Sequence, residues 1–155
     1  MDKKLVIEAI IQSLEKDFQL AQGASKDAAE YATHEEAKAD SKWDTQGLEA
    51  SYLAAGQAAH ALELGEAIQY FRSLLETVGE DEWVQAGSMF AIENPMGKHW
   101  YFLSVKGGGA SVTLDGSLVT VVTPGSPIAA KILGKSVGFE WALPNGKICS
   151  IVELS

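Results

Sequence analysis

Residues 5–23 read LVIEAIIQSLEKDFQLAQG, and residues 48–78 read LEASYLAAGQAAHALELGEAIQYFRSLLETV. In both stretches apolar or small residues recur at alternating spacings of four and three, which is the pattern of a coiled-coil seam. The expected seam positions are Ile7, Ile11, Leu14, Phe18, Ala21, Ala28 and Ala32 in the first arm, then Leu48, Tyr52, Ala55, Ala59 and Leu62, and after a phase shift Leu64, Ile68, Phe71, Leu75 and Val78. No proline precedes Pro95. The pattern therefore predicts two long helices.

The segment between these helices is short and polar, with the sequence ADSKWDTQG at residues 39–47. A short break of this kind folds two helices back on each other as an antiparallel pair. Each arm of about 30 residues would be about 45 Å long at 1.5 Å per residue. Gly23 lies inside the first arm, where a glycine either kinks the helix or breaks it, and the sequence leaves both outcomes open.

The pattern changes after Gly79 to short apolar runs separated by turn signals, of which Asp115-Gly116 is the strongest. Ser126 and Pro127 form a typical start for one short helix. Strands are expected at residues 88–92, 99–105, 111–114, 118–122, 139–143 and 147–152, and the helix at 128–133. The predicted fold class is α+β, with a helical hairpin at residues 1–79 and a small antiparallel sheet domain at 80–155.

Composition limits the partners of this chain. The net charge is −9, of which the first 79 residues carry −7, whereas a protein that binds duplex DNA usually needs the opposite sign. An acidic arm suits a basic protein surface, a metal ion or simple solubility. The single Cys149 excludes an intramolecular disulfide and a cysteine zinc site. The absence of a long apolar run, together with Glu8 near the start, favours a cytoplasmic protein without a membrane span.

Candidate chemistry concentrates at the break between the arms, because no catalytic triad, phosphate loop or dinucleotide fingerprint is present. Asp44, Glu49 and Asp40 are the candidates for proximity to a metal ion, since converging carboxylates can share one divalent cation with a partner. The alternative is that Asp44 caps the second helix and the other two are solvated. Trp43 either clasps across the hairpin or contacts a partner.

Residues 121–138 read VVTPGSPIAAKILGKSVG, which resembles the signature V…SPIA…LLGK…VGD of the bacterial Gre transcript-cleavage factor family. The order of parts is also similar, because that family joins an N-terminal antiparallel coiled coil to a small FKBP-like sheet domain. Tyr52, Ala54 and Ala55 match the end of the family tip pattern GDLxENAEYxAA. Asp44 and Glu49 are each displaced by one residue from the acidic positions of that pattern.

The resemblance implies a transcription elongation factor whose coiled coil enters the secondary channel of RNA polymerase. The tip carboxylates would help to hold the second catalytic Mg²⁺ of the polymerase, and contact with nascent RNA and DNA would be indirect. Gly125, Ser126 and Pro127 would dock at the channel rim, with Gly125 replacing the usual Asp or Asn. Such a factor stimulates cleavage by the polymerase and is not an enzyme by itself.

Two alternatives stay open at this point. The first is a polymerase-binding regulator that does not stimulate cleavage, of the anti-Gre or Rnk type. The second is a coiled-coil interaction protein unrelated to polymerase, which would dimerise through the apolar first half of the N-terminal arm.

Overall fold

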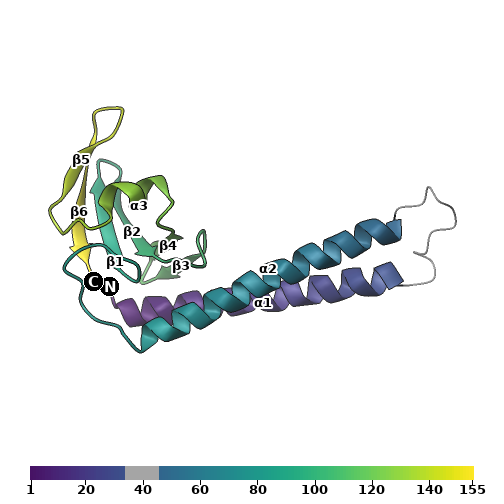
Figure 1. The fold of residues 1–155 in the computed structure, drawn as a ribbon. Coiled ribbons are helices and arrows are strands. Elements are labelled where there is room, and N and C mark those ends of the chain that lie inside the picture. Colours follow the sequence, from purple (N-terminus) through teal and green to yellow (C-terminus); the bar gives the residue numbers. More distant parts are fainter. Residues whose placement is uncertain (34–45) are drawn as a thin grey trace. The chain divides into compact units, whose positions relative to one another are not determined.

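The computed structural model describes residues 1–33 and 46–155 and begins with two long helices that run side by side (Figure 1). Helix α1 spans Lys3–Thr33 and helix α2 spans Gln46–Leu75. The Ser25 hydroxyl donates a hydrogen bond of 3.1 Å to the Ala54 carbonyl, which ties the two helices together. Helix α1 passes through Gly23 without a break, and a methyl group added there would meet nothing within 4 Å. The two predicted helices are confirmed, and Gly23 does not break the first.

Contacts divide the described chain into two compact units. One unit contains Met1–Ser13 and Ala67–Ser155, and the other contains Leu14–Glu66. Each long helix therefore contributes to both units. The predicted boundary after residue 79, placed where helices give way to strands, stays a prediction about which part folds by itself.

The phase predicted for the first half of α2 is wrong. Leu48, Tyr52 and Leu62 were expected in the seam, but their exposed fractions are 54%, 70% and 66%. The positions that are buried or half-buried instead follow one unbroken alternation of four and three, namely Ala50, Ala54, Gln57, Ala61, Leu64, Ile68, Phe71 and Leu75. The well-buried end of α2 sets this phase, because a continuous helix cannot shift its seam without local distortion. Small side chains consequently face α1, and larger ones face outward.

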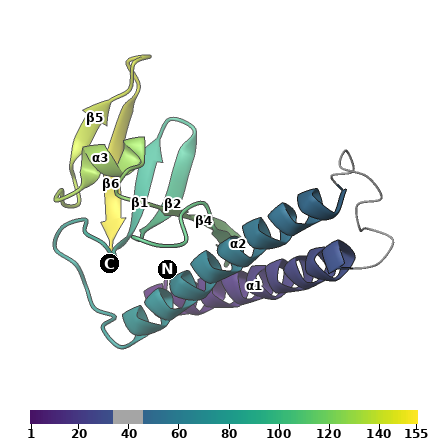
Figure 2. The same ribbon diagram turned by 45° about the vertical axis from the view of Figure 1, so that its right-hand side comes forward.

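A six-stranded sheet follows the helices, with the strand order β3-β4-β2-β1-β6-β5. Figure 2 shows its central strands β2, β1 and β6 side by side. The elements are β1 (Met89–Asn94), β2 (Gly97–Leu103), β3 (Ser111–Leu114), β4 (Ser117–Val122), α3 (Pro127–Ile132), β5 (Glu140–Ala142) and β6 (Ile148–Leu154). These bounds agree with the predicted strands and short helix to within a few residues, and the α+β class is confirmed.

The sheet is mixed rather than wholly antiparallel, because β2 and β4 pair in parallel while the other four pairs among the described strands are antiparallel. Of the two strands in the β3–β4 hairpin, β4 lies beside β2 and β3 forms the edge of the sheet. Burial explains this choice: β4 carries the buried Val119 and Val121, whereas β3 buries only Val112. The more apolar strand gains more by taking the inner position.

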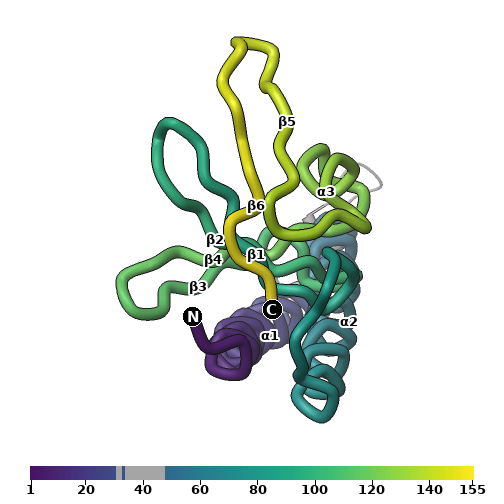
Figure 3. The backbone as a smooth tube through the Cα atoms, turned by 90° about the vertical axis from the view of Figure 1, so that its left-hand side faces the viewer, coloured from purple at the N-terminus to yellow at the C-terminus, as the bar shows by residue number. Residues whose placement is uncertain are grey.

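Side chains pack on both faces of this sheet. On one face α3 lies beside the β5–β6 hairpin (Figure 3), and its Ala129 and Ile132 join a buried cluster with Val84, Phe90, Ile92, Leu103, Cys149 and Ile151. Phe102 points to the opposite face, where its ring lies 5.5 Å from that of Phe71 on α2. Val6, Ile7 and Ile10 of α1 are fully buried in the same unit. Much of the apolar first half of the N-terminal arm is therefore covered by the chain itself, while Leu5 and Leu20 are exposed. The alternative that this arm forms a dimer interface stays a prediction.

Candidate functional site

The segment predicted to dock on a partner forms the start of helix α3. Ser126 is the N-cap residue, and its hydroxyl accepts a hydrogen bond of 3.2 Å from the Ala129 amide. Pro127 occupies the first turn, where its fixed φ suits a helix and its missing N–H is not needed. Gly125 and Pro127 are exposed, and Ser126 is half-buried. The three predicted docking residues thus form one surface turn, and the cap gives Ser126 a structural role that its sequence position predicted.

Hydrogen bonds just after the C-terminal end of α3 attach this segment to the linker, residues 76–88, that joins α2 to β1. The Val84 amide donates to the Lys135 carbonyl at 2.8 Å, and the Gly134 amide donates to the Val84 carbonyl at 2.8 Å. The Ser136 hydroxyl donates to the Glu82 carbonyl at 2.7 Å. These bonds fix the segment that follows α3, and the burial of Ala129 and Ile132 anchors the helix itself in the core.

Three large apolar side chains near α3 are exposed, and the sequence alone did not single them out. Leu133 is 50% exposed, Val137 is 54% exposed, and Trp83 on the attached linker is 49% exposed. Lys135 lies close by, with its ammonium 4.9 Å from the centre of the Phe139 ring. An alternation of apolar residues with lysines directly after a capped helix start was the available signal for this surface.

The predicted tip candidates have different outcomes. Glu49 lies in the first turn of α2 and is exposed, at the helix end where a negative charge is favoured. Asp40, Trp43 and Asp44 lie outside the described residues. Within residues 1–33 and 46–155 no group of three His, Cys, Asp or Glu side chains could hold a metal ion. Proximity of the tip to a metal therefore stays a prediction.

A polar cluster between the start of α1 and the linker was not predicted. The Lys3 ammonium lies 2.9 Å from a carboxylate oxygen of Asp81 and donates to the Gly79 carbonyl at 3.2 Å. The Gln85 amide group donates to the other Asp81 oxygen at 2.8 Å. Burial by itself would raise the pKa of Asp81, but hydrogen bonds from Lys3, Gln85 and Ser88 and the Lys3 charge outweigh it and lower that pKa. This cluster is fully paired and ties the N-terminus to the linker, so its role is structural.

Neither of the long helices, nor any other helix among the described residues, is apolar over enough of its length to span a bilayer.

No protein-family model matches this chain, and no curated protein sequence matches it. Among solved structures, GreA factor homolog 1 (Gfh1) of Thermus thermophilus is 21% identical, covers 96% of this chain and 94% of its own, and has a TM-score of 0.35. Gfh1 of Thermus aquaticus is 19% identical, with coverages of 96% and 93% and a TM-score of 0.34. A further structure, described as the transcription factor Gfh1, is 22% identical, with coverages of 95% and 90% and a TM-score of 0.33.

Proposed function

We propose that this protein is a Gre-like transcription elongation factor of the bacterial cytoplasm that binds RNA polymerase and places its helical hairpin in the secondary channel. The observation that carries the proposal is the segment 121–138, whose sequence resembles the Gre signature. The fold supports the proposal, because Gly125 and Pro127 are exposed on a turn that a partner could reach, while Ala129 and Ile132 anchor the segment in the core.

The hairpin has dimensions and charge that suit such a channel. Its helices contain 31 and 30 residues, which corresponds to about 45 Å of length for each. Alanines fill the seam of its middle part, so the two helix axes can lie close together and the pair stays thin. The excess of acidic residues favours approach to a basic channel entrance over approach to nucleic acid.

At the tip, Glu49 fits the role of one oxygen ligand near a magnesium ion held mainly by the polymerase, because Mg²⁺ commonly takes one or two carboxylates together with water. Asp44 and Asp40 are the further candidates, and Trp43 would contact the channel. The metal would supply charge stabilisation for RNA cleavage in the polymerase active centre, and this chain would lend a carboxylate without catalysing the reaction alone.

Binding is tested first, with fluorescently labelled protein titrated into bacterial core RNA polymerase. Saturable binding is expected, and its absence would overturn the proposed function. Pro127→Glu should weaken binding because it places a charge on the docking turn, whereas Pro144→Glu, which makes the same substitution on the exposed β5–β6 turn, serves as the matched control.

Cleavage is tested separately, in stalled elongation complexes with end-labelled RNA. If the tip supports cleavage, the wild type shortens the RNA and Asp44→Ala and Glu49→Ala do not, while Glu63→Ala, an exposed acid farther along α2, behaves as the wild type. If the wild type binds polymerase without shortening the RNA, the protein is a non-cleaving regulator. The one-residue displacement of Asp44 and Glu49 from the family pattern is the specific observation that favours this second function.

A further inference from the structure

Helix α2 carries a second apolar stripe that the described residues, 1–33 and 46–155, leave uncovered. We call Leu48, Tyr52, Ala55, Ala59 and Leu62 the outer stripe; all five are exposed, and Tyr52 shows 70% of its surface. Their spacing is again four, three, four and three, which is the spacing by which one helical element packs against another. Residues 50–62 contain no Asp, Glu, Lys or Arg. Solvent-facing helix surfaces normally carry such charges, so this face has the composition of a covered surface.

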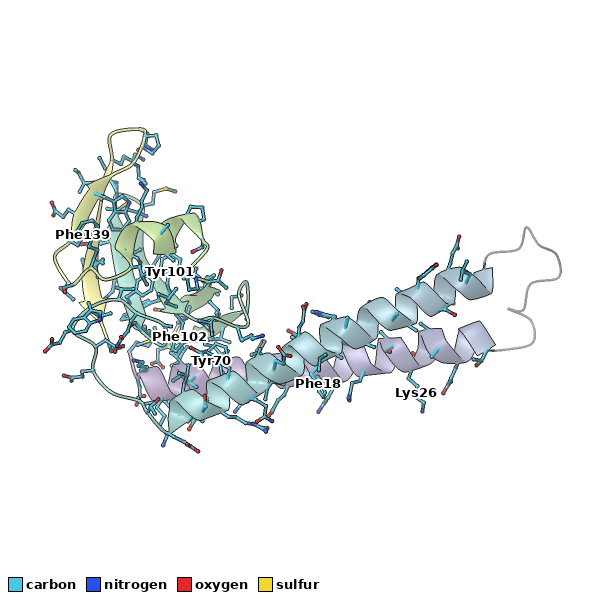
Figure 4. The ribbon with its side chains drawn as sticks, viewed as in Figure 1. Phe18, Lys26, Tyr70, Tyr101, Phe102 and Phe139 are labelled. Atoms are coloured by element: carbon cyan, nitrogen blue, oxygen red, sulfur yellow. The ribbon has the colours of Figure 1, made fainter. Side chains whose placement is uncertain are left out.

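The outer stripe continues into a groove of about 650 Å³ between the two helices. The groove is lined by Phe18 and Ala29 of α1 and by Ala58, Ala61 and Leu62 of α2, among others. Phe18 and Lys26, both on α1, mark it in Figure 4. Leu62 belongs to both the stripe and the groove. The apolar surface therefore extends from α2 toward α1 and is wider than a single row of side chains.

Gly56 points to the same face. It lies one turn after Tyr52, and a methyl group added at this position would meet nothing within 4 Å. A glycine inside a helix is destabilising relative to alanine. Nothing in the described part of the chain requires a glycine at this position, whereas a partner surface that approaches α2 closely would require it.

Charge decides between a second copy of this chain and a different partner. The unit Leu14–Glu66 contains eleven acidic residues against four lysines, a net charge of −7. Two copies joined along their outer stripes would place two such charges side by side, which is unfavourable. A partner surface with an apolar strip would pack against the outer stripe, and basic residues at the margins of that strip would pair with the acidic side chains of this unit.

We infer that the outer stripe of α2 is the face by which the hairpin contacts its protein partner, and that the occupant is an apolar strip with basic margins on the wall of the polymerase channel. This inference rests on the proposed function for the identity of the partner. It assigns contact to one side of the rod along its shaft, apart from the docking turn at α3 and from the carboxylates of the tip.

The experiment compares charge insertions on the two helices of the full-length protein, with binding to core RNA polymerase as the readout. Tyr52→Glu and Leu62→Glu should each weaken binding about thirtyfold, the effect of removing an interface anchor worth about 2 kcal/mol. Tyr52→Phe should bind as the wild type. The matched control is Gln19→Glu, which adds the same charge at an exposed position of α1 and should change affinity less than about twofold. Circular dichroism and melting temperature establish that all variants are folded.

Photocrosslinking gives a second readout. A benzophenone amino acid at position 52 should crosslink to polymerase, and the same group at position 19 should not. If the wild type binds polymerase but Tyr52→Glu binds as tightly as Gln19→Glu, the inference is overturned and the proposed function stands. If the wild type does not bind polymerase, both the inference and the proposed function are overturned. A dimer in light scattering that Tyr52→Glu dissociates would likewise overturn the inference, because the occupant would be a second copy.

Discussion

Replacing Lys3 with methionine removes one partner of a largely buried ion pair while keeping the apolar stem of the side chain. The side chains of Lys3 and Asp81 are only 10% and 14% exposed, and their charged atoms lie 2.9 Å apart. The variant loses this contact and the hydrogen bond to the Gly79 carbonyl, but the Asp81 carboxylate keeps its hydrogen bond from Gln85. We expect the free energy of unfolding to fall by about 2 kcal/mol at neutral pH. This loss is smaller than that for a fully buried charge left without any partner, because Asp81 keeps its hydrogen bond from Gln85.

The effect should depend on pH with a definite sign. The folded pKa of Asp81 lies below its ordinary value of 3.8, so the unfolded chain takes up a proton first as the pH falls. The stability that the ionised carboxylate contributes is therefore complete well above pH 3.8 and is lost as the pH falls through the folded pKa. Lys3→Met removes a cause of the low pKa, so the difference in stability between the wild type and the variant should shrink in acid.

Urea unfolding followed by tryptophan fluorescence measures this difference at neutral pH and at about pH 3. Lys4→Met is the matched control, because Lys4 is the exposed neighbour of Lys3 and its loss should cost less than about 0.5 kcal/mol. Equal losses for the two lysines, or a difference for Lys3→Met that does not change with pH, would refute the assigned role of the Lys3–Asp81 pair.

Three further substitutions test other parts of the fold. Ser126→Ala should lower the free energy of unfolding by about 1 kcal/mol through loss of the α3 cap, and Ser126→Asn should restore it, because asparagine also caps helices. If polymerase binding stays weak in Ser126→Asn, the serine hydroxyl itself contacts the partner. Phe71→Ala should cost about 3–5 kcal/mol in urea unfolding, because this ring is fully buried against Phe102, and a loss below about 1 kcal/mol would contradict that packing. Gly23→Ala should raise the melting temperature, with a gain of up to about 1 kcal/mol, since α1 is continuous there and has room for a methyl group; a lower melting temperature would mean that α1 is not regular at this position.

Local features of the sequence were sufficient to predict most elements of the fold. The long helices follow from apolar spacing and from the absence of proline, and the start of α3 follows from Ser126 and Pro127. The Asp115-Gly116 pair predicted the β3–β4 hairpin, and both residues have the positive φ that such a turn requires. Each of these signals acts over a few residues, so it can be recognised without knowledge of the partners in space.

Only the part of the candidate site that is local in sequence was predictable in the same way. Gly125, Ser126 and Pro127 are adjacent in the chain, and they lie together on the surface as expected. The exposed Trp83 and Leu133 are 50 positions apart, and hydrogen bonds between Val84 and the segment after α3 attach the linker to that segment. Such a juxtaposition has no counterpart in local sequence pattern.

By itself the sequence determined which segments become helix or strand, because hydrophobic period, capping residues and turn residues act locally. Only the tertiary structure decided which of two possible stripes on α2 faces α1, that β4 rather than β3 lies beside β2, and that Lys3 pairs with Asp81. These choices depend on burial summed over residues far apart in the chain. The small side chains took the seam because the buried end of α2 sets the phase of the whole helix, and the larger Leu48, Tyr52 and Leu62 were thereby left to face outward.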